Sequence, residues 1–267
     1  IALSANTTGA SNTALGYASL NLNTTASNNT AVGYASLNQN TTGSENTSLG
    51  HNALYANTTG TANTGIGQGA LQGNTTANNN TAVGKAALSV NTTGFGNSAL
   101  GKGALSSNTT ANYNTAVGME ALRENTTGSS NSAYGLYSLL TNTTGNSNVA
   151  VGQSALYANT TGTRNVAVGV NSLDANTVGD KNIAIGMDAL SGNVDGSRSV
   201  AVGDSALQVQ DPASAVAMYN TAVGHAAGNQ VTTGTENTII GALAGDALTD
   251  SDRNVALGYS ADRKSVV

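Results

Sequence analysis

The chain has 267 residues, a net charge of −5 at pH 7, and only 9% charged residues, against about 25% in ordinary globular domains. It contains no Cys, which excludes a disulfide framework and a cysteine-based zinc site, and it has no run of eighteen apolar residues that could span a membrane. The acidic balance disfavours a nucleic-acid partner, and no Lys/Arg cluster stands out beyond Arg263 and Lys264.

Glycine recurs at an almost constant interval of 17 residues along the chain. An Asn stands four residues before each of these glycines, except that Ser199 takes its place once. A fixed short period indicates one small unit stacked many times. We therefore predict an all-β chain, a parallel β-solenoid or β-roll of about fifteen 17-residue rungs. The recurring glycines are Gly16, Gly33, Gly50, Gly67, Gly84, Gly101, Gly118, Gly135, Gly152, Gly169, Gly186, Gly203, Gly224, Gly241 and Gly258.

Each rung is too short for a pair of helices but long enough for two short extended runs. In the rung that starts at Asn29, one run is Thr30–Val32 and the other surrounds Leu37. Gly33 follows the first run and an Asn follows the second, and both residue types favour turns. The pattern predicts two strands and two turns per coil. The repeated Gly would be required either because its φ is positive or because another backbone segment approaches it closely.

Four columns of equivalent residues are predicted to hold the stack together. The aliphatic residue before each Gly, such as Val32, and the later Leu, such as Leu37, should form two apolar ladders facing each other inside the coil. Asn29 belongs to a first Asn column, which begins at Asn12, and Asn40 belongs to a second, which begins at Asn6. Stacked amides in each column would hydrogen-bond from rung to rung.

Strand alternation leaves the middle residue of each first run on the other face. If Thr30 and Val32 point inward, Ala31 and its small equivalents point outward. A uniformly small outward column predicts close packing against a neighbouring copy of the chain. The alternative is that a tight bend in the coil excludes larger side chains.

We treat residues 1–267 as a single repeat array, with regular rungs over 12–198 and altered rungs over 220–267. The chain opens and closes inside a repeat, so we expect it to be a segment of a longer protein. One insertion lies within 199–219 and contains Asp211 and Pro212. Pro interrupts a strand ladder, so we expect an outward loop there, either a recognition loop or a tolerated surface insertion.

Few other residues suggest a binding site. Tyr17 and Tyr34 follow the repeated Gly and could stack on sugar rings, or they could occupy a variable solvent position. The Asn-Thr-Thr tripeptides match the N-glycosylation pattern, although stacking alone would produce the same spacing. His51 and His225 lie ten rungs apart and cannot share a site, so we expect no catalytic residue, metal or cofactor.

Residues 148–152 read Asn-Val-Ala-Val-Gly, and 165–169, 182–186 and 199–203 repeat this pattern closely. This resembles the head repeats of trimeric autotransporter adhesins, whose unit is shorter. The longer form, with Asn-Thr-Ala-Val-Gly and Asn-Thr-Thr-Gly, is similar to repeats in phage tail fibres. The resemblance implies a trimeric extracellular or virion fibre used for attachment.

The main functional hypothesis is an adhesive or structural fibre on a cell surface or virion, not an enzyme. Its partners would be other copies of itself and a cell-surface glycan or protein receptor, bound multivalently. A self-assembling extracellular filament is the first alternative. An ice-binding solenoid is the second, although adjacent threonines such as Thr24 and Thr25 should point to different faces. A lyase-type β-helix enzyme would need clustered Asp, Arg or Lys.

Overall fold

The computed structural model describes residues 1–262 and divides into two compact units, Ile1–Ser130 (unit 1) and Asn131–Val267 (unit 2). The described residues form no helix, and every strand has three residues. Unit 1 contains β1 (Thr13–Leu15), β2 (Thr30–Val32), β3 (Thr47–Leu49), β4 (Thr64–Ile66), β5 (Thr81–Val83), β6 (Ser98–Leu100) and β7 (Thr115–Val117). Unit 2 contains β8 (Ser132–Tyr134), β9 (Val149–Val151), β10 (Val166–Val168), β11 (Ile183–Ile185), β12 (Val200–Val202), β13 (Thr221–Val223), β14 (Thr238–Ile240) and β15 (Val255–Leu257).

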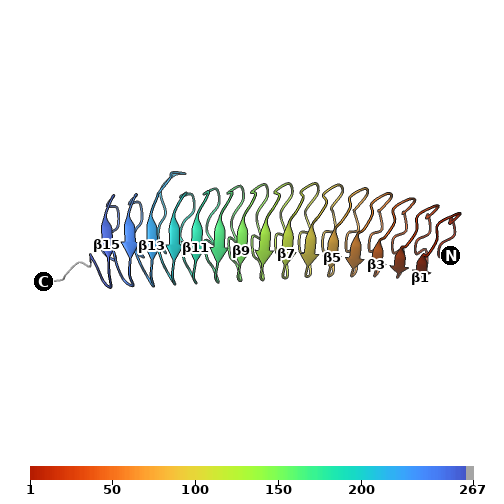
Figure 1. Cartoon of the computed structure of the whole chain (residues 1–267), viewed down its shortest axis with the longest axis horizontal. Helices are drawn as coiled ribbons and strands as arrows, with labels where there is room; N and C mark the ends of the chain where they lie inside the picture. The colour runs from red at the N-terminus through yellow and green to blue at the C-terminus, as the bar shows by residue number, and fades with distance from the viewer. Residues whose placement is uncertain (263–267) are drawn as a thin grey trace. The chain divides into compact units, whose positions relative to one another are not determined.

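Within each unit the strands pair in parallel and in chain order, so each unit is a parallel β-solenoid (Figure 1). Thr30 pairs with Thr47, one rung ahead, and this register of 17 holds for nearly every pair. Between β12 and β13 the partner of Val200 is Thr221, so the insertion is absorbed without breaking the sheet. The predicted fold class and the 17-residue rung are confirmed.

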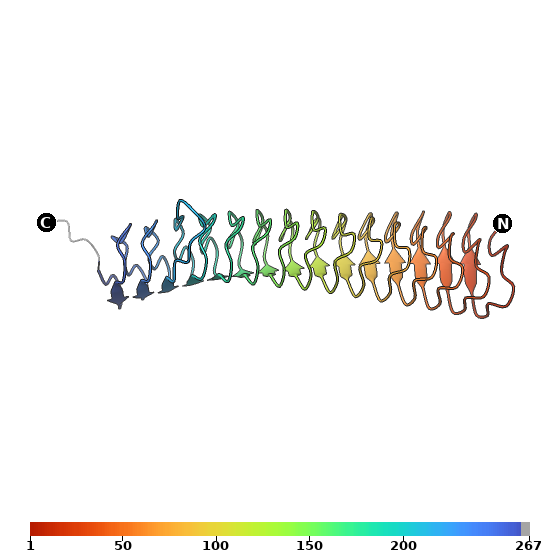
Figure 2. The ribbon, with the colours of Figure 1, turned by 90° about the horizontal axis from the view of Figure 1, so that it is seen from above.

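Each rung contains one strand rather than the two that we predicted. The strands lie along one side of each unit, and turns form the rest of the coil (Figure 2). The run around Leu37 is a turn, because Ala35 and Leu37 both adopt left-handed backbone conformations, with φ of 50° and 51°. A left-handed Leu costs on the order of 1–2 kcal/mol, and full burial of its side chain returns about 1.5–3 kcal/mol.

The strand alternation is as expected, but the inward and outward faces are the reverse of our prediction. Ala31 is fully buried, whereas Thr30 is exposed and Val32 is half-buried. The inside of the coil is narrow: a Cβ added to Gly65, which is equivalent to Ala31, would lie 3.2 Å from Cγ of Leu54. The small column is therefore set by limited space inside the coil, and the prediction that a neighbouring copy packs against it is wrong.

The predicted leucine column does form the centre of the apolar core. Twelve leucines are fully buried in consecutive rungs, and the middle residues of the strands pack on the same interior. The buried leucines are Leu20, Leu37, Leu54, Leu71, Leu88, Leu105, Leu122, Leu139, Leu156, Leu173, Leu190 and Leu207.

Both predicted Asn ladders are present, and their members are buried except the half-buried Asn6, Asn12 and Asn254 at the ends. In one ladder, Nδ2 of Asn40 donates to Oδ1 of Asn23 (3.0 Å) and to the carbonyl of Gly43 (2.8 Å). In the other, Oδ1 of Asn29 accepts the backbone N–H of Asn46 (2.9 Å), while its Nδ2 also donates to Gly43 (3.0 Å). Each buried amide is satisfied by its own rung and the adjacent one, which offsets its desolvation.

The repeated glycines meet both requirements that we proposed for them. Gly33 has φ of 131°, and a Cβ there would lie 2.6 Å from the carbonyl oxygen of Gly50. Gly50, Gly67, Gly84 and Gly101 repeat this conformation, with φ between 125° and 139°. No side chain fits between the stacked turns at this position.

Candidate interaction surfaces

The outward face of the sheet, defined here as the first and third residues of every strand, carries no charged residue in any of the fifteen strands. Its third-residue column is aliphatic apart from Tyr134 and is partly open to solvent: Leu49 is 46% exposed and Leu100 is 50% exposed. Contiguous exposed apolar surface of this kind marks interaction sites in soluble proteins.

The outward face differs between the two units in its first-residue column. In unit 1 this column is Thr or Ser in all seven strands. In unit 2 it is Val or Ile over β9–β12, so both outward columns are aliphatic there. Unit 2 therefore presents the more apolar part of this face.

Tyr17 and Tyr34 are exposed, but they are stacked on each other and on His51. The ring centroids of Tyr17 and Tyr34 lie 5.4 Å apart, and those of Tyr34 and His51 lie 5.1 Å apart, with nearly parallel planes. The ring faces turned toward each other are not open to a sugar. Contact with a glycan at these residues stays a prediction, restricted to ring edges and the outermost face.

The insertion forms a segment that projects between β12 and β13 (Figure 1). Asp211 and Pro212 lie at its base, because Pro212 is buried and the backbone N–H of Asp211 donates to the carbonyl of Thr232 (3.0 Å). Asp211 and residues 213–216 are exposed, and only Pro212 between them is buried. Recognition by this loop stays a prediction that would use Asp211 and the tip but not Pro212.

Gln210 is a structural residue that the sequence analysis missed. It is fully buried and takes the place of an Asn in the second ladder, where Nε2 donates to Oδ1 of Asn193 (3.0 Å). Its Oε1 accepts from Nδ2 of Asn220 (2.8 Å) and Oγ of Ser199 (3.1 Å). The longer amide thus bridges both ladders in the rung where Ser199 replaces Asn. Its position 17 residues after Asn193 was the available signal.

Arg164, Lys181 and Arg198, named here the basic column, occupy equivalent exposed positions on three consecutive rungs of unit 2. The prediction from the sequence of no Lys/Arg cluster beyond Arg263 and Lys264 is therefore wrong. The three residues are dispersed in the sequence, but their spacing of 17 places them side by side. The guanidinium of Arg198 also lies 5.5 Å from the ring centroid of Tyr219, the equivalent residue of the next rung, and donates to its hydroxyl.

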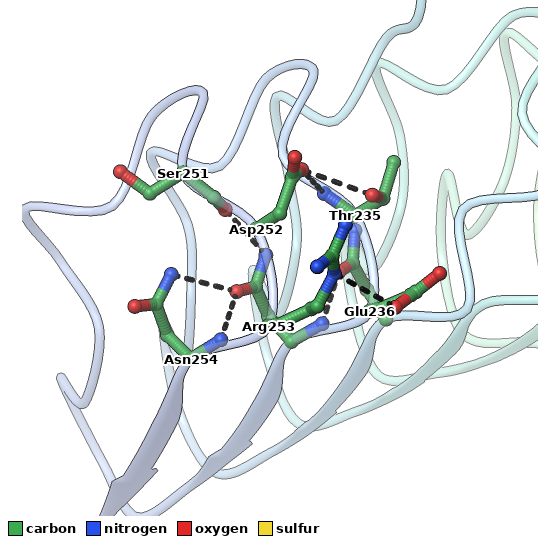
Figure 3. Close-up of polar contacts among 8 residues, drawn as sticks. Thr235, Glu236, Ser251, Asp252, Arg253 and Asn254 are labelled. Carbon is green, nitrogen blue, oxygen red and sulfur yellow. Dashed lines mark hydrogen bonds and ion pairs between the residues drawn. The ribbon is translucent and has the colours of Figure 1, made fainter.

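Polar side chains also tie rungs together near β14 and β15, as Figure 3 shows. The carboxylate of Asp252 accepts from the backbone N–H (2.7 Å) and Oγ1 (2.9 Å) of Thr235, and these hydrogen bonds lower its pKa. Arg253 and Glu236 form an ion pair of 3.3 Å beside them. These contacts link one rung to the next and leave no open site between them.

The Asn-Thr-Thr motifs are not available for glycosylation in the folded chain. Their asparagines belong to the second ladder; Asn40 and Asn57, for example, are fully buried, and Nδ2 of each is already hydrogen-bonded. Glycan attachment requires that nitrogen, so stacking explains the spacing of the motifs.

Within residues 1–262, no three side chains of His, Asp or Glu gather where they could hold one metal ion. The same part of the chain has no helix long and apolar enough to cross a membrane. No protein-family model, curated protein or solved structure gives a significant match to this chain.

Proposed function

We propose that the chain is part of a structural and adhesive fibre on the outside of a cell or a virion, in which copies pack through the outward face of the sheet. The uncharged, partly apolar outward face carries the proposal. Other exposed positions do take charges, such as Lys85 and Lys102 on adjacent rungs. Exclusion of charge from one face alone is expected where that face is covered by a partner.

Copies of a solenoid can cover this face with little change in structure. If three chains run in the same direction around a common axis, the outward columns of all three meet there, and closed symmetry leaves no free copy of the face. The resemblance to trimeric adhesin repeats supports three as the number. The inner alanine column, which lies inside each chain, takes no part in this packing.

The test is the absolute mass in solution by light scattering coupled to size exclusion. We expect three times the chain mass of 26.3 kDa. A monomer would overturn the proposal. Large, polydisperse particles would favour the self-assembling filament instead.

A matched pair of variants locates the interface. Val151→Lys with Ile185→Lys charges the outward face, where these residues are 37% and 40% exposed. Val170→Lys with Val178→Lys charges residues off this face with similar exposure, 43% and 39%. We expect the first variant to become monomeric with an unchanged circular dichroism spectrum, and the second to keep the wild-type mass. Equal behaviour of the two variants would place the interface elsewhere.

The adhesive part of the proposal concerns what the fibre binds. Identical rungs present identical weak contacts many times, which raises overall affinity without any single strong site. Binding of the assembled protein to a glycan array would support adhesion. Absence of binding to any glycan or cell surface would leave a passive structural fibre.

Ice binding remains a second candidate because of one observation in unit 1. There the outward face places a Thr column beside an aliphatic column on a regular sheet. Thr24 and Thr25, which we expected to point to different faces, lie outside this face, and Oγ1 of Thr24 is hydrogen-bonded to the carbonyl of Thr41 (3.1 Å). Thermal hysteresis that Thr47→Lys abolishes and Thr59→Lys retains would favour ice binding, since both residues are exposed but only Thr47 lies on the face.

A further inference from the structure

We propose that the basic column, Arg164, Lys181 and Arg198, binds a linear polysaccharide that carries a carboxylate or sulfate on successive sugars. The inference deepens the adhesive role under Proposed function and rests on it, because it names the chemical class of the receptor. It does not require a particular oligomeric state.

The three cations are held in register by the backbone. The N–H of Lys181 donates to the carbonyl of Thr163 (2.9 Å), and the N–H of Arg198 donates to the carbonyl of Asp180 (2.9 Å). All three residues share the left-handed conformation, with φ of 59°, 59° and 65°. Their side chains therefore leave the coil at equivalent points, separated by the strand spacing of roughly 4.8 Å.

The column is not neutralised by the protein. In the described part of the chain no carboxylate lies within ion-pair distance of any of the three, whereas Arg123 pairs with Glu120 (2.8 Å) and Glu124 (2.6 Å).

The acidic side chains nearest in sequence to the column are engaged by hydroxyl groups. Asp180 accepts from Oγ1 of Thr163 (2.9 Å), and Asp195 accepts from Oγ1 of Thr177 (3.0 Å).

Folding alone does not account for this arrangement. Like charges stacked roughly one strand spacing apart on adjacent rungs repel one another. The whole chain has only nine Lys and Arg residues, and four of them stand at this position of the rung: the three of the basic column and Arg253, which pairs with Glu236. A stacked row of cations that no carboxylate neutralises, in an otherwise acidic protein, is expected where an anionic partner neutralises it.

The spacing selects the class of anion. One extended pyranose unit advances a polysaccharide by about the same length as one strand spacing. A polymer with one charge on each sugar thus presents one anion to each rung. Tyr219, which is 51% exposed, continues the column on the next rung. The guanidinium of Arg198 lies over one face of its ring, which leaves the ring edge and the other face for contact with a sugar. The net charge of −5 disfavours the more highly charged nucleic acids.

The experiment measures binding of the full chain to polygalacturonate, to chondroitin sulfate and to neutral dextran by biolayer interferometry, at about 50 mM and about 500 mM salt. The test variant is R164Q/K181Q/R198Q. The matched control is K85Q/K102Q/R123Q, which removes the same number of positive charges from unit 1, away from this column. Thermal unfolding of both variants checks the fold, and the test variant should be no less stable than wild type because it relieves repulsion.

We expect wild type to bind at least one of the two charged polymers and to ignore dextran, with weaker binding at high salt. The test variant should lose at least about tenfold in affinity and the control less than about twofold. Equal losses in both variants would overturn the site, as would no binding to either charged polymer. Tighter binding to duplex DNA or to phosphatidylserine vesicles would overturn the assignment to a polysaccharide. A monomeric wild type that still binds through this column would refute the trimer and leave this site standing.

Discussion

Units 1 and 2 share their interior over most of their length and differ in their exteriors. In both, buried leucines, small mid-strand residues and two Asn ladders repeat up to residue 210. In the last rungs of unit 2, Val231 and Leu248 replace the Asn of the second ladder, and Ile239 replaces the small mid-strand residue. Outside, residues 1–130 hold six charged side chains with no net charge, whereas residues 131–267 hold seventeen and the whole net charge of −5. The outward face changes as well: its first-residue column is Thr or Ser throughout unit 1, and it becomes Val or Ile over β9–β12 of unit 2.

The comparison shows which positions the coil itself determines. An inward residue must pack against the equivalent residues of the adjacent rungs or hydrogen-bond with them, so stacking fixes its size and its hydrogen bonding. An outward residue is free of that constraint and can reflect what meets it. The differences between the units are therefore where interactions with other molecules should be sought.

The largest expected effect is a loss of stability that should be the same in both units. Gly50→Ala and Gly135→Ala would each place a Cβ 2.5–2.7 Å from the carbonyl of the next rung, at φ of 136° and 133°. We expect each to lower the free energy of unfolding by about 3–5 kcal/mol in urea denaturation. Gly69→Asn, at φ of 67° with no close backbone atom, should cost less than about 1 kcal/mol. A much milder effect in one unit would show that the interiors differ.

The second prediction compares a regular rung of the second Asn ladder with the rung in which Gln210 replaces Asn. Asn57→Ala in unit 1 and Gln210→Ala in unit 2 each remove three buried hydrogen bonds. Each should cost about 2–4 kcal/mol, because buried partners are left unsatisfied. Gln72→Ala, at an exposed site, is the control and should change stability by less than about 0.5 kcal/mol. Near-neutral Gln210→Ala would mean that the insertion rung does not depend on this bridge.

The third prediction compares how much the outward face of each unit contributes to self-association. Leu49→Lys with Leu100→Lys charges the outward face of unit 1 and should weaken association less than Val151→Lys with Ile185→Lys does in unit 2. The reason is that the neighbouring column in unit 1 is Thr or Ser, so less apolar contact surrounds each substitution. We expect a difference of about tenfold in the dissociation constant from sedimentation equilibrium. The reverse order would assign the main interface to unit 1.

The smallest expected effect is on pH dependence, and it belongs to unit 2 because the first Asp in the chain is Asp174. Burial raises the pKa of Asp174, with a further contribution from Asp188. The stabilising contribution of protonated Asp174 is fully present below the unfolded pKa of 3.8 and is lost as the pH rises through the higher folded pKa. Asp174→Asn should therefore stabilise the protein at neutral pH, by less than about 0.5 kcal/mol after solvent screening.

Asp252 has the opposite effect on the pH dependence of stability. Hydrogen bonds from Thr235 lower its pKa, so its stabilising contribution is present above 3.8 and is lost as the pH falls through the lower folded value. Asp252→Asn should lower Tm slightly at neutral pH and have no such effect at low pH. Melting curves of both variants between about pH 2 and pH 7 would test the two signs together.

The sequence alone determined the period, the parallel stacking, the leucine column, both Asn ladders and the need for Gly at each turn. These follow from repetition, because equivalent residues in a stack must lie above one another. The same rule, applied to charged residues, would have located Arg164, Lys181 and Arg198.

Only the tertiary structure decided how many strands each rung has and which strand face points inward. Alternation places Ala31 opposite Thr30 and Val32, but it does not say which side is the core. That choice depends on Leu37. Its left-handed backbone turns the chain back sharply, and its side chain fills the narrow interior, so that only a small residue fits opposite it. Local propensity does not predict a buried Leu in that conformation, since its strain is offset only once the rungs are stacked.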